Sequence, residues 1–292
     1  MKGTVNWVFD AVGGFLVDDG WPISSHIALS MLTSMFPFLI FITALAGFLG
    51  ASDLADTATK LIFEAWPQGV AGPIASEVQN VLTQPRGGLL TIGGVLALYF
   101  SSSAVEALRT GLNRAYDAID PRPWWLLRLQ SILFMMVASF AILTLAFFVV
   151  LEPLIWTKAL EYAPHLAPLQ QFITVARLGV AAVALCLTLL VAHLWLPAVK
   201  LRVVDVAPGV ILTFVGGVGF GELFGLYLSE FARNYVSTYA GLASVMITLV
   251  FLYSLSAIFV FGGELNAAIL RSGRREKVRL RRAARVRGAN RG

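Results

Sequence analysis

The chain has 292 residues, of which 58% are hydrophobic and 13% charged, and its mean hydropathy is +0.77. Because soluble domains carry about 25% charged residues, this composition excludes an ordinary soluble protein and predicts a polytopic membrane protein. The single cysteine, Cys186, excludes an intrachain disulfide and has no second cysteine with which to form a zinc site.

The first predicted element is an amphipathic helix over residues 3–18, where apolar side chains recur at helical spacing. Asp18 to Gly20 end this helix, and Trp21-Pro22 fits an interfacial turn. The helix either lies on the membrane surface or packs on the body of the protein, and the pattern leaves both open. The first residues lack the apolar core of a cleavable signal peptide, so we expect the first span to be retained.

The first membrane span is predicted over residues 23–50, with Pro37 in its middle. Proline removes one helix hydrogen bond and frees the carbonyl of Thr33, four residues back. Pro37 is therefore a candidate hinge, with a static kink as the commoner alternative. Residues 51–88 then predict two short helices, a hairpin that rests on one face of the membrane.

The second span, predicted over residues 88–108, has a polar end. Glu106 and Arg109 are three residues apart, so they can pair on one helix face. A basic loop over 109–130 follows, and Trp124 and Trp125 mark the return to the interface.

Four more apolar segments complete an all-α membrane protein of six transmembrane helices. These spans are predicted over residues 131–151, 173–196, 208–228 and 242–270, with loops over 152–172, 197–207 and 229–241. Residues 1–270 then form a single six-helix membrane domain, and residues 271–292 form a basic tail.

Lysine and arginine counts orient the predicted spans. With both termini on one side, that side holds 17 basic residues and the other side holds 4. The positive-inside rule therefore places both termini in the cytoplasm. Ten basic residues of the tail face one acid, Glu276, which fits a contact with anionic lipids. A disordered tail that helps to fix topology is the plainer alternative, and the lack of interleaved aromatic residues argues against a nucleic-acid partner.

Polar residues in apolar segments are the candidates for a substrate or ion path, because ionised groups are costly in hydrocarbon and must face protein, water or a ligand. In the predicted topology Arg177 and Glu222 both lie towards the outer side, where they are expected to pair. The carboxylates could couple protons or bind a cation, and the arginines could hold a phosphate. The candidate path residues are Glu106, Arg109, Arg177, Glu222, Glu264 and Asn266.

Gly217, Gly221 and Gly225 recur every fourth residue and predict a face for close helix packing. The three histidines show no metal-binding spacing, and the sequence has neither a nucleophile elbow nor a phosphate-binding loop. We therefore expect no metal, no cofactor and no enzymatic activity.

Four segments resemble the YihY/virulence factor BrkB family of bacterial inner-membrane proteins. The most specific is Phe224–Ala268, with an aromatic loop from Tyr235 to Gly241 and a terminal Gly-Glu-Leu-Asn-Ala. The other three segments are Ala28–Pro37, Ser103–Asp117 and Asp205–Gly209.

This resemblance implies six membrane helices and an inner-membrane location, and similar proteins suggest the transport of lipid or of an envelope component. Members have carried the name ribonuclease BN, but this sequence has no acidic or histidine metal cluster to support that activity. The leading hypothesis is a transporter or lipid-handling protein with a lipid or small-molecule substrate. A membrane scaffold whose buried charges only pair with one another is the alternative, and the oligomeric state is left open.

Overall fold

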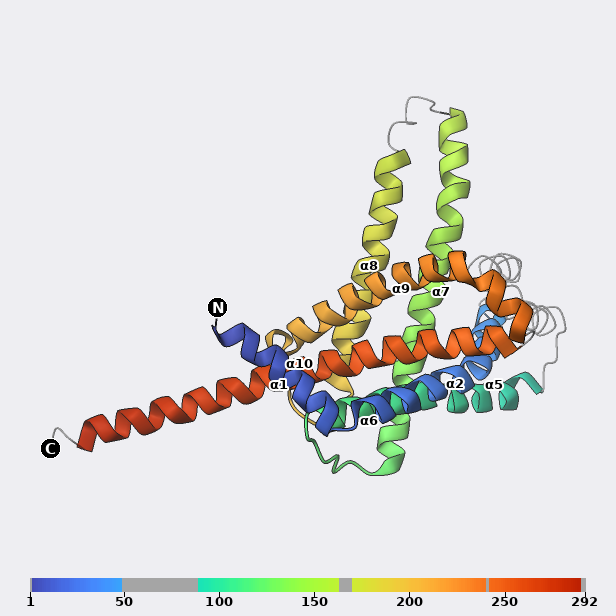
Figure 1. Cartoon of the computed structure of the whole chain (residues 1–292). Coiled ribbons are helices and arrows are strands. Elements are labelled where there is room, and N and C mark those ends of the chain that lie inside the picture. The colour runs from blue at the N-terminus through green and yellow to red at the C-terminus, as the bar shows by residue number, and fades with distance from the viewer. Residues whose placement is uncertain (1, 49–88, 163–169, 240–241, 290–292) are drawn as a thin grey trace.

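The structure, a computed structural model, describes residues 2–48, 89–162, 170–239 and 242–289, which form helices and short connections with no strand among them (Figure 1). The all-α prediction is therefore confirmed for this part of the chain, and the hairpin predicted over 51–88 lies outside it. The helices are α1 (Lys2–Val17), α2 (Gly20–Phe48), α5 (Leu89–Ser101), α6 (Ser103–Ala115), α7 (Trp124–Tyr162), α8 (Gln170–Trp195), α9 (Val203–Tyr239) and α10 (Leu242–Ala289).

Four of these helices contain segments that are long and apolar enough to cross a membrane. They are Gly20–Ile42, Trp124–Leu143, Val203–Leu228 and Val245–Gly273, and Trp7–Val17 and Gly179–Trp195 are shorter apolar stretches. The predicted spans over 88–108 and 173–196 are helical, but neither contains a described crossing segment of this length. The described residues thus establish a multi-helix membrane architecture and leave six crossings as a prediction.

Helices α2, α5, α9 and α10 run roughly alongside one another, and α7 and α8 run across them and project beyond them (Figure 1). Helix α10 contacts α1, α2, α6 and α9, which makes it the central element of the packing. Its C-terminal part extends past the other helices (Figure 1).

The N-terminal helix turns sharply into α2. Asp19 adopts a left-handed conformation with φ of 58°, and a Cβ on Gly20 would overlap the ring of Phe15. The change of chain direction therefore comes before Trp21-Pro22. These two residues lie in the first helical turn of α2, where a proline costs no hydrogen bond. Phe15 is buried and its ring packs edge-on against Phe261 of α10, so one face of α1 packs on the protein body. Phe9, Leu16 and Val17 are exposed on α1, and a membrane-surface role for that side stays a prediction.

Helix α2 is continuous through Pro37. Ser34 Oγ donates to the Ser30 carbonyl at 2.5 Å, and Thr33 Oγ1 donates to the Leu29 carbonyl at 2.9 Å. Both hydroxyls therefore bond carbonyls one turn before the Thr33 carbonyl that Pro37 frees. Such side-chain bonds to the preceding turn are known to bend helices. The hinge stays a prediction.

Several helices are longer than the hydrophobic pattern predicts. Helix α7 runs on to Tyr162, α9 spans Val203–Tyr239, and α10 runs on to Ala289. The predicted loops over 152–172, 197–207 and 229–241 are therefore partly helical, and the tail is helical as far as Ala289 rather than a disordered extension. Hydropathy detects where a helix stops being apolar, whereas helix propagation continues through good helix formers such as Arg, Ala and Leu.

Helices α5 and α6 form a nearly continuous rod across Ser102. The Ser102 amide donates to the Leu98 carbonyl at 3.1 Å, and the Glu106 amide donates to the Ser102 carbonyl at 3.2 Å. This rod contains the predicted second span and carries Glu106 and Arg109 on its second half. Helix α6 packs against α2, α7 and α10, and Leu112 in its last turn is fully buried.

Candidate functional site

Glu106 is the centre of a charged cluster between α6 and the start of α7. Its Oε2 atom accepts a hydrogen bond from Arg128 Nη1 at 2.5 Å, and its Oε1 atom lies 3.9 Å from Arg109 Nη2. The ion pair between Glu106 and Arg109 is as predicted, but it is the longer of the two. Two guanidinium groups thus share one carboxylate, which leaves the cluster with a net positive charge.

Arg128 links α7 to the end of α5. Its Nη2 atom donates to the Tyr99 carbonyl at 2.7 Å, and its guanidinium carbon lies 3.6 Å from the centre of the Tyr99 ring. A cation at this distance from an aromatic face is attracted by the ring quadrupole. Backbone, ring and carboxylate therefore hold Arg128 in one orientation, so its charge is presented from a rigid frame.

Arg109 is buried and joins α6 to α7. Its Nη1 atom donates to the Leu127 carbonyl at 3.0 Å and to Ser131 Oγ at 3.1 Å. The positive charge of Arg109 is only partly compensated, because the Glu106 carboxylate lies closer to Arg128 than to Arg109.

A cavity of about 440 Å³ opens beside this cluster and is bounded by α2, α5, α6 and the start of α7. Its volume falls within the range of small-molecule sites, roughly 300–1,000 Å³. Charged, hydroxyl and aromatic groups share its wall, so it can accept a polar group with an apolar attachment. The lining residues are His26, Ser30, Tyr99, Ser103, Glu106, Ala107, Arg109, Thr110, Trp124, Leu127 and Arg128.

Glu264 lies elsewhere, in the contact between α10 and α1. Its side chain is 1% exposed, and its Oε2 atom accepts a hydrogen bond from Arg271 Nη2 at 3.1 Å. A Cβ on Gly14 of α1 would come within 2.5 Å of the same oxygen, so α1 crosses directly over the carboxylate. Glu264 therefore faces protein, as the cost of a lipid-facing charge requires.

Asn266 lies in the contact between α10 and α9. Its Oδ1 atom accepts a hydrogen bond from the Gly209 amide at 2.7 Å, and it is fully buried. A Cβ on Gly209 would overlap both the Gly262 carbonyl and the Asn266 side chain. Two of the segments that carry the family resemblance, Asp205–Gly209 and the Gly-Glu-Leu-Asn-Ala end of α10, thus meet in one close helix contact.

The glycine row predicted for helix packing is not where the described helices approach most closely. A Cβ on Gly221 or Gly225 would meet no described atom within 4 Å, and one on Gly217 would reach Leu255 at an ordinary 3.7 Å. The close approach is at Gly209 and Gly262 instead, because the α9–α10 crossing lies nearer the first turns of α9. Spacing identifies small residues but not where a partner helix crosses them.

Glu222 is exposed on α9, among exposed apolar neighbours such as Leu223 and Leu226. Arg177 belongs to α8, and its side chain lies outside what the structure describes. The pairing of Arg177 with Glu222 therefore stays a prediction.

Sequence reasoning missed Arg128 and Tyr99. The arginine follows a loop and lies 22 residues from Glu106, so helical spacing points to Arg109 as the partner. The tryptophans that precede Arg128 could have indicated that it starts a helix at the same membrane level as the polar end of α6. Among the described residues, no group of three or more histidine, cysteine or acidic side chains could hold a metal ion.

The long apolar helices and the charged cavity define the class, a multi-pass helical membrane protein. The chain belongs to the family described as virulence factor BrkB, whose model matches residues 11–287. The resemblance that the sequence segments indicated is thereby confirmed.

Two relatives extend this comparison. The ribonuclease-like protein YfkH of Bacillus subtilis is 28% identical over 255 residues, which cover 87% of this chain and 92% of YfkH. A UPF0761 membrane protein of Rhodospirillum centenum is 27% identical over 282 residues, which cover 92% of this chain and 58% of that protein. This chain thus spans less than two thirds of the second relative. No solved structure shows a significant match.

Proposed function

We propose that this protein binds and transfers an amphipathic lipid or envelope component, with its polar headgroup in the cavity beside Glu106. The observation that carries the proposal is the cavity of about 440 Å³, which brings two arginines, one glutamate and two aromatic side chains together at the ends of apolar helices. A phosphate suits this wall, because guanidinium groups bind it through charge-assisted hydrogen bonds.

The excess of positive charge supports an anionic headgroup. Arg109 and Arg128 both line the cavity, and Glu106 is the one acidic residue among the described residues of its wall. Trp124 and Tyr99 are amphipathic rings of the kind that lie at the level of lipid headgroups. Glu106 and Arg109 are thus the candidate path residues that share this cavity.

The remaining path residues enter the proposal differently. Glu264 and Asn266 support the frame, since they hold α1 and α9 against α10. Arg177 and Glu222 are proposed to line the outer part of the route in a membrane, where an exposed carboxylate would otherwise face lipid.

Reconstituted vesicles test this function. The full chain is placed in liposomes with fluorescent phosphatidylglycerol, and transfer between leaflets is followed by chemical quenching of the outer label. We expect transfer above protein-free vesicles, and a loss of at least tenfold in Glu106→Gln and Arg109→Gln. Thr110→Val is a matched control, since Thr110 lines the same cavity but carries no charge. Equal rates in all variants and in empty vesicles would contradict the proposal.

A scaffold is the second candidate, favoured by the pairing of the charges. Glu106, Arg109 and Arg128 bond one another or the backbone, and Glu264 pairs with Arg271. A scaffold predicts that the same variants change stability without any transport to lose. Stability and transfer measured on the same preparations therefore separate the two functions.

The setting of this function is also a proposal. We place the protein in the bacterial inner membrane with both termini in the cytoplasm, on the distribution of basic residues. The basic end of α10 would then contact anionic lipids. No enzymatic activity is proposed, and the ribonuclease-like name belongs to YfkH.

A further inference from the structure

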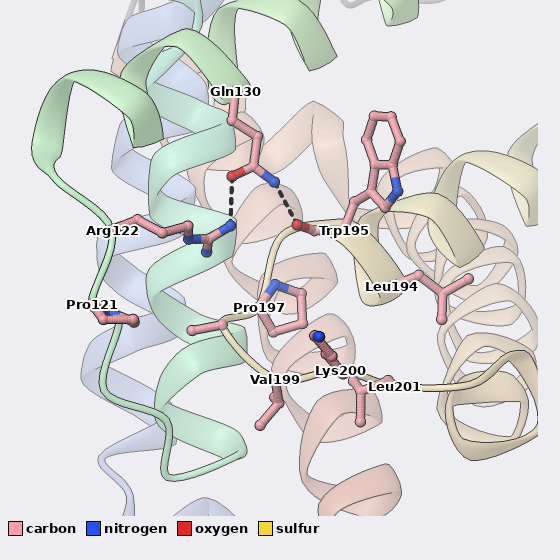
Figure 2. Close-up of a pocket in the computed structure, with 10 residues that line it drawn as sticks. Pro121, Arg122, Gln130, Leu194, Trp195, Pro197, Val199, Lys200 and Leu201 are labelled. Carbon is pink, nitrogen blue, oxygen red and sulfur yellow. Dashed lines mark hydrogen bonds between the residues drawn. The ribbon is translucent and has the colours of Figure 1, made fainter.

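A second and larger cavity lies on the other side of the start of α7. It is an open cavity with a volume of about 720 Å³, and it is bordered by the segment before α7, the end of α8 and the loop that leads to α9 (Figure 2). None of the candidate path residues whose side chains the structure describes lines it.

One wall of this second cavity is polar and rigid. Arg122 Nη1 donates to Gln130 Oε1 at 2.9 Å, and Gln130 Nε2 donates to the Trp195 carbonyl at 2.5 Å (Figure 2). Arg122 Nη2 donates to Asp120 Oδ2 at 2.6 Å. Hydrogen bonds from Arg122 hold the pKa of the Asp120 carboxyl below its ordinary value, so this pair stays ionised.

The opposite wall carries a cation with no partner among the described residues. Lys200 is exposed and lies across the view from Arg122 and Gln130 (Figure 2). The rest of that wall is apolar, with Leu194, Val199 and Leu201. A free ammonium beside apolar side chains suits a molecule that carries both a negative charge and a hydrocarbon part.

Three apolar segments place this cavity at one membrane face. The segments Trp124–Leu143 and Val203–Leu228 begin beside it, and Gly179–Trp195 ends beside it. Beyond it, α7 and α8 run alongside each other (Figure 1) and carry exposed apolar side chains, including Leu129 and Leu133 on α7 and Leu187 and Val191 on α8. Polar contacts are thus available at headgroup level, with apolar surfaces for hydrocarbon chains next to them.

We propose that this second cavity binds one anionic glycerophospholipid, with its phosphate against Lys200 and its acyl chains along α7 and α8. The volume is in the range of ligand sites, and Trp195, which is 58% exposed, provides an interfacial ring beside it. The bound lipid adds to the contacts between the segments around residues 121, 195 and 200, which Arg122, Gln130 and Asn113 already link by hydrogen bonds. This site does not depend on the proposed transfer function, because the two cavities have different lining residues in the part of the chain that the structure describes.

Native mass spectrometry of the full chain in detergent, titrated with phosphatidylglycerol or phosphatidylcholine, tests the site. We expect tighter binding of phosphatidylglycerol, and about a fivefold weaker preference in Lys200→Gln, the loss expected from one basic residue near a lipid surface. Arg114→Gln is the control, because Arg114 is an exposed basic residue on the same predicted side that does not line the cavity, and its preference should match the wild type. An unchanged preference in Lys200→Gln would overturn the proposal, as would glycerol phosphate that competes as well as the whole lipid.

Fluorescence provides a second measurement at the apolar wall. Phosphatidylglycerol with brominated chains should quench tryptophan emission more strongly than brominated phosphatidylcholine, and Trp195→Phe should remove most of that difference. A difference that persists in Trp195→Phe would place the lipid elsewhere and overturn the site. Lys200→Gln and Trp195→Phe should leave the leaflet-transfer rate unchanged. Failure of the lipid site in the second cavity is therefore distinguishable from failure of the proposed transfer function.

Discussion

The regions around Glu106 and around Glu264 and Asn266 start from the same sequence signal, a polar residue near the end of an apolar helix, and are built in opposite ways. Around Glu106, arginines from two helices meet one carboxylate beside an open cavity, and the Glu106 side chain is 31% exposed. Around Glu264 and Asn266 the helices touch, and both residues are almost fully buried, at 1% and 0%.

This difference shows that a buried polar residue has two uses in a membrane protein. Where side chains are long and helices are held apart by them, charged groups border a space that a ligand can enter. Where small residues let helices approach closely, the polar group packs and forms hydrogen bonds within the helix contact. Gly209 and Gly262 let two backbones meet, and Gly14 lets the backbone of α1 approach the Glu264 side chain. The partner residues, rather than the polar residue itself, decide which use applies.

The largest expected effect is at the close contact between α9 and α10. Gly209→Ala should destabilise the protein by about 3 kcal/mol, because the new methyl group would overlap the backbone carbonyl of Gly262. Gly221→Ala is the matched control on the same helix, with open space around it, and should be neutral or slightly stabilising. Thermal unfolding in detergent measures both, and equal melting temperatures would show that the helices do not touch at Gly209.

Next in size is the loss of an arginine from the charged cluster. Arg128→Gln should lower the free energy of unfolding by about 2 kcal/mol. The substitution removes the closer of the two arginines that pair with Glu106, and it removes the hydrogen bond to the Tyr99 carbonyl. Arg114→Gln is the comparison, because its pair with Asp19 is exposed on both sides, and should change stability by less than about 0.5 kcal/mol. Denaturant titration that gave the same loss for both variants would contradict a structural role for the pair of Glu106 and Arg128.

Asn266→Ala should have an intermediate effect, about 1–2 kcal/mol. The substitution leaves the Gly209 amide without its side-chain acceptor in a fully buried contact. Its leaflet-transfer rate per folded molecule should equal the wild type, since Asn266 does not line the cavity beside Glu106. If Asn266→Ala kept a normal melting temperature but lost lipid transfer, Asn266 would belong to the substrate path rather than to the helix contact.

Glu264→Gln is expected to have the smallest effect, within about 1 kcal/mol of the wild type. The amide keeps an oxygen for Arg271, and the lost attraction is offset by a smaller cost of burial. Glu264→Leu, which removes the acceptor, should cost more than Glu264→Gln. If Glu264→Gln instead abolished transfer without destabilising the protein, the carboxylate charge itself would be functional.

Local patterns were sufficient for part of the site. The spacing of Glu106 and Arg109 predicted an ion pair that the structure contains, and apolar periodicity predicted helices where α1, α2, α8 and the apolar part of α10 lie. These features depend on residues close in the chain, for which helix geometry fixes the distance. Arg128 and Tyr99 could not be found in this way, because the contact joins elements that are distant in sequence.

The amino-acid sequence by itself determined that this is an all-helical membrane protein of the BrkB family, since apolar length, helical spacing and the family segments are all properties of a linear chain. Only the tertiary structure decided that Glu106 borders a cavity while Glu264 and Asn266 close helix contacts, and that Gly209 rather than Gly221 is the point of close approach. The physical reason is that a crossing point depends on how two whole helices fit together, and no spacing within one helix records where its partner will lie.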